Sequence, residues 1–142
     1  HSEKQLKGRA YRASCASVFL YSAGAVALPI SLVSISRELG FSLAQGGALG
    51  FFQSIEQFFV LVASSFLAAR FGKIRVLRAG LGFLAAGLAL FTLSANYLHA
   101  VTLMLIIGLG NALLEALLTP IVEDLFPGDD GTKMNLLHAF WP

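Results

Sequence analysis

Four long apolar runs, separated by short polar connections, dominate the sequence. They cover residues 13–36, 43–69, 74–96 and 100–122, and a further apolar stretch opens at about residue 135. A bilayer core of about 30 Å needs roughly 20 apolar residues of helix. Each of the four runs reaches that length. The pattern therefore predicts four membrane-spanning helices and the beginning of a fifth.

The composition agrees with a membrane protein. The 142 residues are 56% hydrophobic and 13% charged, whereas soluble domains carry about 25% charged residues. The alternatives are buried helices of a soluble protein and a cleaved signal peptide at the front. Buried helices of a soluble protein are disfavoured because the apolar runs are too long. A cleaved signal peptide is disfavoured because further spans follow the first run. We expect an all-α integral membrane protein in contact with the lipid bilayer.

The sequence begins with His1 and stops inside an apolar run. No Pro-rich or Ser-rich linker divides it. We therefore expect residues 1–142 to be the N-terminal part of a single larger domain, with the C-terminal remainder absent.

Basic residues are distributed unequally between the connections. Nine of the ten Lys and Arg residues lie in the N-terminal flank, the connection between the second and third runs, or the last connection, and only Arg37 lies elsewhere. Basic residues mark the cytoplasmic side of a membrane protein. The bias predicts a multi-pass protein with a cytoplasmic N-terminus, which we place in a bacterial inner membrane.

Polar side chains at membrane depth are the first candidates for function. They are expensive in lipid and usually face a bundle interior or a water-filled cavity. Asn111 and Glu115 are four residues apart and share one face of the fourth run. They predict either a site for a proton or a solute, or a structural acid paired with another helix.

The second run carries a similar polar group. Gln53, Glu56 and Gln57 have spacings of three and four, which place them on one helix face. They either line a transport path or hold helices together by hydrogen bonds. Gly46 and Gly50, about one turn earlier, form a small-xxx-small pair that predicts close helix packing.

Two prolines predict interruptions of the helices. Pro29 lies in the first run and Pro120 in the fourth. Proline removes a backbone hydrogen bond. Interrupted segments in corresponding positions of two repeats point to the binding site of a transporter.

Motifs of soluble enzymes and of metal sites are missing. The sequence has no HExxH, CxxC, Gly-rich phosphate loop or GxSxG. We expect no enzymatic activity, no cofactor, no metal and no nucleic-acid partner.

The stretch from Ser65 to Leu77 resembles the cytoplasmic loop motif of the major facilitator superfamily, Gly-x-Leu-Ala-Asp-Arg-x-Gly-Arg-Arg-x-x-Leu. Lys73 stands in place of the motif's Arg after the second Gly and keeps its positive charge. Ser65 and Ala69 replace the family's Gly and Asp. In the family that Asp helps to lock the two halves of the protein together. The matching positions are Leu67, Ala68, Arg70, Gly72 and Leu77.

A second stretch resembles the fucose–galactose–proton symporter branch of that superfamily. Glu115 precedes Pro120 by the family's spacing, and Asn135 opens an Asn-Leu-x-His-x-Phe segment. The resemblance implies that Glu115 couples protons or contacts sugar, and that Asn135 and His138 lie at the cytoplasmic mouth of the fifth span. The family's Asn before the proline is Thr119 here, and its acid in the first span is absent.

These resemblances imply a major-facilitator-type helix bundle. The expected function is secondary active transport of a small polar, sugar-like solute by alternating access, coupled to protons. Residues 103–110 lack the Arg of drug antiporters, which favours sugar transport over drug efflux. A non-transporting four-helix scaffold and a solute sensor are the alternatives.

Overall fold

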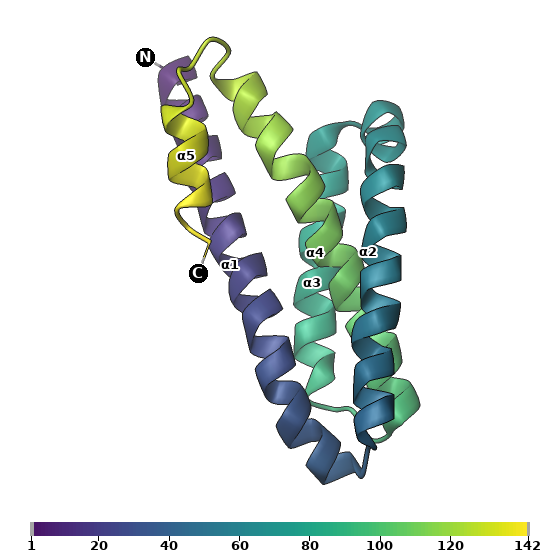
Figure 1. The fold of residues 1–142 in the computed structure, drawn as a ribbon. Helices are drawn as coiled ribbons and strands as arrows, with labels where there is room; N and C mark the ends of the chain where they lie inside the picture. Colours follow the sequence, from purple (N-terminus) through teal and green to yellow (C-terminus); the bar gives the residue numbers. More distant parts are fainter. Residues whose placement is uncertain (1, 142) are drawn as a thin grey trace.

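The computed structural model describes residues 2–141, apart from the side chains of residues 27, 28 and 31. The described residues contain no strand, which confirms the all-α fold (Figure 1). The helices are α1 (Ser2–Leu39), α2 (Leu43–Phe71), α3 (Lys73–Phe91), α4 (Tyr97–Leu125) and α5 (Thr132–His138).

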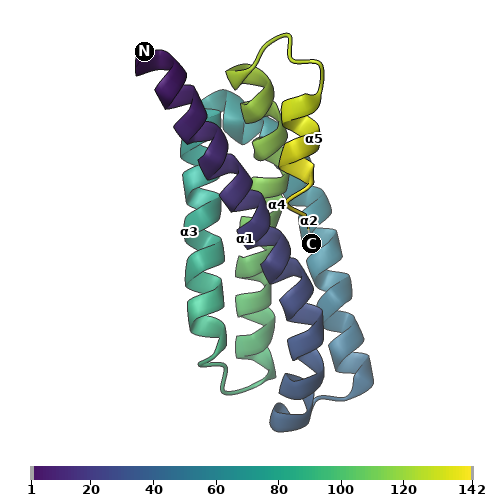
Figure 2. The same ribbon diagram turned by 90° about the vertical axis from the view of Figure 1, so that its left-hand side faces the viewer.

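α4 is the central helix of the bundle. It packs against α1, α2 and α3, and the short α5 lies beside the first part of α1 (Figures 1 and 2). The start of α1, the α2–α3 connection and the α4–α5 connection share one end of the bundle, which we name the N-terminal end. The basic residues of the predicted cytoplasmic side gather at this end. Its orientation in a membrane stays a prediction.

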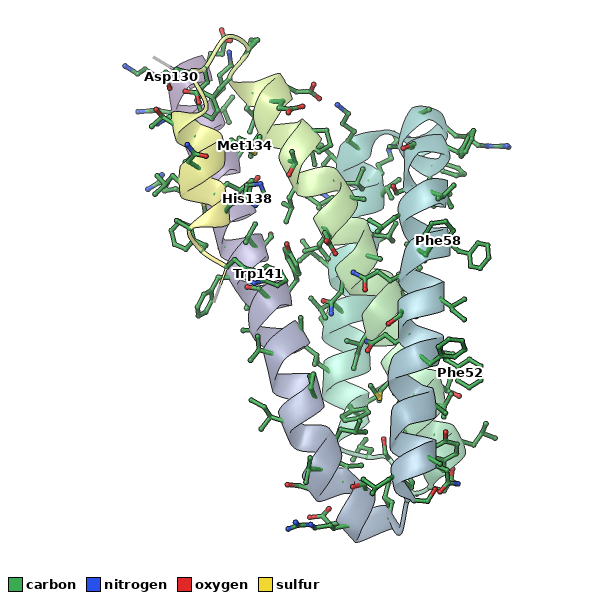
Figure 3. The ribbon with its side chains drawn as sticks, in the orientation of Figure 1. Phe52, Phe58, Asp130, Met134, His138 and Trp141 are labelled. Atoms are coloured by element: carbon green, nitrogen blue, oxygen red, sulfur yellow. The ribbon has the colours of Figure 1, made fainter. Side chains whose placement is uncertain are left out.

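Three of the described helices are long and apolar enough to cross a membrane: α2, α3 and α4. The predicted span 13–36 falls within α1, where the structure does not describe the side chains of residues 27, 28 and 31. This first span and the predicted fifth span therefore stay predictions. Phe52 and Phe58 on α2 point away from the bundle (Figure 3), and both are more than half exposed. Such a surface suits lipid and not water.

Local caps set where the helices begin and end. Ser42 and Gln45 form a capping box at the start of α2, which satisfies two backbone N–H groups. The Asn96 side chain accepts a hydrogen bond from the His99 N–H and begins α4. Gly72, with φ +88°, is the single residue between α2 and α3, and this backbone conformation favours glycine.

The predicted helix breaks at Pro29 and Pro120 are absent. Each proline lies inside a helix that continues past it. A proline removes one N–H donor, and the hydrogen bonds on both sides of it keep the helix intact. Pro29 thereby frees the carbonyl group of Ala25, four residues earlier.

Glycines allow α3 and α4 to approach closely. A Cβ atom on Gly110 would lie 2.6 Å from the backbone nitrogen of Leu84, and one on Gly87 would lie 2.5 Å from Cγ1 of Ile107. A Cβ atom on Gly80 would meet Cβ of Leu113 at 2.9 Å. We name this contact the α3–α4 seam, formed by Gly80, Leu84, Gly87, Ile107, Gly110 and Leu113.

The close packing predicted at Gly46 and Gly50 is wrong for the described part of the chain. A Cβ atom on either glycine would have nothing within 4 Å, because this face of α2 is not covered by the other described helices. The glycines that pack closely are those of α3 and α4.

Candidate functional site

A cavity of about 170 Å³ lies between α1, α2 and α4. It brings together most of the polar residues predicted at membrane depth. α2 contributes Gln53 and Gln57, α4 contributes Asn111 and Glu115, and the remaining wall includes Tyr21, Ala25, Gly108 and Trp141. The two glutamines, the asparagine and the glutamate were candidates on two separate helices in the sequence analysis, and the structure brings them to one cavity.

A second cavity, of about 410 Å³, adjoins the first toward α5. Tyr21, Glu115 and Trp141 line both cavities. Thr119 and His138 line only the second. Glu115 therefore lies where the two spaces meet.

Gln57 holds the Glu115 carboxylate in place. Its Nε2 donates a hydrogen bond of 2.7 Å to Oε2 of Glu115. A carboxylate has room for about four hydrogen bonds, so Glu115 keeps acceptor capacity for a solute. Glu115 is also exposed, which leaves it accessible from the cavity.

Asn111 is an unsatisfied polar residue in the cavity wall. The residue is only 8% exposed, and its Oδ1 atom has no hydrogen-bond partner among the described residues. Buried polar atoms are nearly always hydrogen-bonded. An orphan acceptor beside a cavity is therefore suited to a donor that arrives with a ligand.

Glu56 was predicted to be a cavity residue, but it lies elsewhere in the structure. It does not line the cavity. Its buried Oε2 lacks a hydrogen-bond partner among the described residues and would lie 2.6 Å from a Cβ atom on Gly108. The helix rotates by about 100° per residue, so Gln53 and Gln57 can face the cavity while Glu56 lies between α2 and α4.

Trp141 and Tyr21 are site residues that the sequence analysis missed. Their ring centroids are 5.4 Å apart with a tilt of 58°, and both rings line both cavities. Figure 3 shows Trp141 beyond the end of α5, beside α1. The available signal was the spacing of three between His138 and Trp141, which places the two residues near each other.

The residues of the loop motif lie at the N-terminal end of the bundle, away from the cavities. Lys73 forms an ion pair with Asp124 near the end of α4, a partner that the sequence analysis did not identify. The Arg70 guanidinium lies over the ring of the next residue, and Leu77 is partly buried against the core. Gly72 supplies the turn described above.

The α4–α5 connection is anchored on α1. The Tyr11 hydroxyl donates a 2.7 Å hydrogen bond to the Lys133 carbonyl, and the Lys133 ammonium lies over the rings of Tyr11 and Phe126 at 5.5 and 5.7 Å. Hydrogen bonds from Thr132 lower the pKa of Asp130. These contacts position α5 so that His138 reaches the second cavity.

Asn135 lies outside both cavities. It is exposed, and it appears in neither cavity wall. Of the two residues predicted at the mouth of the fifth span, only His138 reaches the site. Among the residues that the structure describes, no cluster of side chains is arranged to hold a metal ion.

Comparison with known proteins identifies the family. The sequence profile of the Major Facilitator Superfamily matches residues 14–142. No curated protein and no solved structure matches the chain.

Proposed function

The chain belongs to the major facilitator superfamily, a family of transporters, and we propose that it is part of a secondary active transporter for a sugar or a related polyol. The solute would cross the membrane by alternating access. It would bind in the two adjoining cavities between α1, α2, α4 and the segment after α5.

One observation carries this proposal: a carboxylate, three amides and an indole ring converge on one cavity region. Glu115 and Asn111 supply acceptors, and Gln57 supplies a donor. Hydroxyl groups of a sugar both donate and accept hydrogen bonds, and the apolar face of its ring suits an aromatic surface such as Trp141. Sites for small ligands combine an apolar wall with a few polar groups in this way.

Glu115 is the candidate for the proton-coupling role. It lines both cavities, so a solute and a proton could reach the same carboxylate. Coupling requires that Glu115 be exposed alternately to the two sides of the membrane. The resemblance to sugar–proton symporters supports this part of the proposal.

The test is sugar uptake by the complete protein in lipid vesicles, driven by a pH gradient, with a panel of hexoses and polyols. We expect the wild type to accumulate one of them and Glu115→Gln to lower accumulation at least tenfold. Glu123→Gln, an exposed acid on the same helix outside both cavities, is the matched control. Unchanged accumulation in Glu115→Gln would exclude its coupling role.

Counterflow separates the two roles of Glu115. If the residue only contacts the solute, exchange of labelled sugar without a pH gradient also falls. Binding of sugar with no counterflow in the wild type would identify a sensor in place of a transporter.

A further inference from the structure

A second carboxyl group lies at membrane depth outside the cavity. Glu56 is 15 residues before the end of α2 at Phe71, which is about 22 Å along the helix. Its Oε2 lies against the α4 backbone at Gly108, where a Cβ atom would be 2.6 Å away. The oxygen occupies the space that a larger side chain at position 108 would fill.

The groups around Glu56 do not neutralise a negative charge. The titratable residue of α4 at this depth is Glu115, itself an acid, and α1 contributes Tyr21 across the cavity. The basic residues of α3 are Lys73, Arg75 and Arg78, all in its first two turns. In the described chain, the ion pairs are Lys7–Glu3 and Lys73–Asp124.

The contact between α2 and α4 also has more acceptors than donors. We name it the α2–α4 seam, formed by Gln53, Glu56, Gln57, Gly108, Asn111 and Glu115. Oε2 of Glu56 and Oδ1 of Asn111 are both buried without a partner. Asn111 follows Gly108 by three residues, about 4.5 Å along α4, so both orphan oxygens lie on the same stretch of the seam.

A proton on Glu56 resolves the problem of its unpaired charge. It removes the negative charge from a carboxyl whose Oε2 atom is buried without a partner among the described residues, which is expensive although the side chain as a whole is only partly buried. It also converts one carboxylate oxygen from an acceptor into an O–H donor.

We infer that Glu56 is a proton-binding site, separate from the solute cavity, and that its proton keeps α2 packed on α4 at Gly108. When the proton leaves, the carboxylate moves toward the water of the neighbouring cavity and the seam separates. The geometry of the α2–α4 seam is the evidence for the proton site at Glu56. The use of this site in transport rests on the proposed function.

Infrared spectroscopy of the complete protein in lipid vesicles tests the site directly, because a protonated carboxyl has its own absorption band. We expect this band in the wild type at neutral pH, its loss in Glu56→Gln, and its retention in Glu115→Gln. Glutamine keeps the shape of the protonated acid and supplies N–H donors, so the fold is expected to persist. An unchanged band in Glu56→Gln would overturn the inference.

A distance measurement tests the consequence for packing. Spin labels replace Leu43 on α2 and Leu98 on α4, which are 97% and 71% exposed, after Cys15 and any other native cysteine are changed to serine. We expect the distance to grow as pH rises in the wild type and to stay constant in Glu56→Gln. The inference would be refuted if the label-to-label distance depended equally on pH in both proteins. It would also be refuted if the distance responded to sodium at constant pH in place of protons.

Neither measurement uses a sugar. If no sugar is taken up but the infrared band is present in the wild type and lost in Glu56→Gln, the proposed function alone is rejected. Successful sugar uptake with an unchanged band in Glu56→Gln rejects the Glu56 site alone.

Discussion

The two faces of α4 differ in what packs against them. At the α3–α4 seam, glycines bring two backbones together and the surrounding side chains are apolar. At the α2–α4 seam, amides and carboxyls meet, a cavity is present, and two buried oxygens lack partners. Van der Waals packing of small residues is a strong source of helix association in lipid. The first seam is built for stability, and the second carries buried oxygens that no described residue satisfies.

Two glycines of α4, two residues apart, show the difference most directly. A Cβ atom on Gly110 would meet the α3 backbone, and a Cβ atom on Gly108 would meet the Glu56 carboxyl, both at 2.6 Å. The distances are equal, but a backbone cannot move aside as a side-chain tip can.

Gly110→Ala should have the largest effect on stability. The added methyl group forces α3 away from α4, and overpacking of this kind destabilises proteins by about 3 kcal/mol at its upper range. The measurement is thermal unfolding of the complete protein in detergent. Gly82→Ala on α3, where a Cβ atom meets nothing within 4 Å, is the control and should leave stability unchanged or slightly raised. Equal stability of the two variants would contradict the close contact.

Asn111→Leu should separate function from stability. Its Oδ1 has no partner among the described residues, so its removal should leave the fold as stable or more stable. Loss of a hydrogen bond to the solute should weaken sugar uptake about tenfold, which corresponds to about 1.4 kcal/mol. Asn135→Leu, on an exposed asparagine outside both cavities, should leave uptake unchanged. A large loss of stability in Asn111→Leu would show that the asparagine is structural.

Gly108→Ala should destabilise the protein by only about 1 kcal/mol, a third of the effect at Gly110, because the Glu56 carboxyl can move into the cavity. The same thermal unfolding assay compares Gly108→Ala and Gly110→Ala. Combining Gly108→Ala with Glu56→Ala should remove most of the loss. If the two glycine variants are equally damaging, the α2–α4 seam is as rigid as the α3–α4 seam.

The ion pair between Lys73 and Asp124 should give the smallest effect. Both side chains are partly exposed, and surface ion pairs contribute about 0.5 kcal/mol. A double-mutant cycle with Lys73→Ala and Asp124→Ala measures this coupling, which should decrease as salt is added. A coupling above about 2 kcal/mol would mean that the pair joins α3 to α4 as strongly as the glycines do.

The sequence predicts what is local and periodic in this molecule. Long apolar runs predict the helices, and spacings of three and four place Gln53 and Gln57 on one face and Asn111 and Glu115 on another. The loop motif predicts the turn at Gly72. These features depend on the chain near each residue.

Other features depend on partners that are distant in sequence. Asp124 pairs with Lys73, and Gly110 with Leu84, because α3 and α4 pack side by side, and no spacing within one helix predicts this. Glu56 shares a face with Gln53 by periodicity, yet the rotation of α2 against α4 places it in the seam and not in the cavity. Trp141 joins the site because α5 packs against α1 and α4 and brings its ring beside that of Tyr21.

The connection at Gly72 has a mechanical consequence. A single residue joins α2 to α3, and α3 is fixed to α4 by its glycines, so α2 is held closely at its Gly72 end. At its other end, the Tyr97 hydroxyl donates a 3.1 Å hydrogen bond to the Gln45 carbonyl. Glu56 lies about 24 Å along the helix from Gly72, whereas Leu43, at the far end of this 29-residue helix, lies about 43 Å away. A tilt of α2 about Gly72 that moves Glu56 by about one ångström would therefore move Leu43 by about two, against the hydrogen bond between Tyr97 and Gln45.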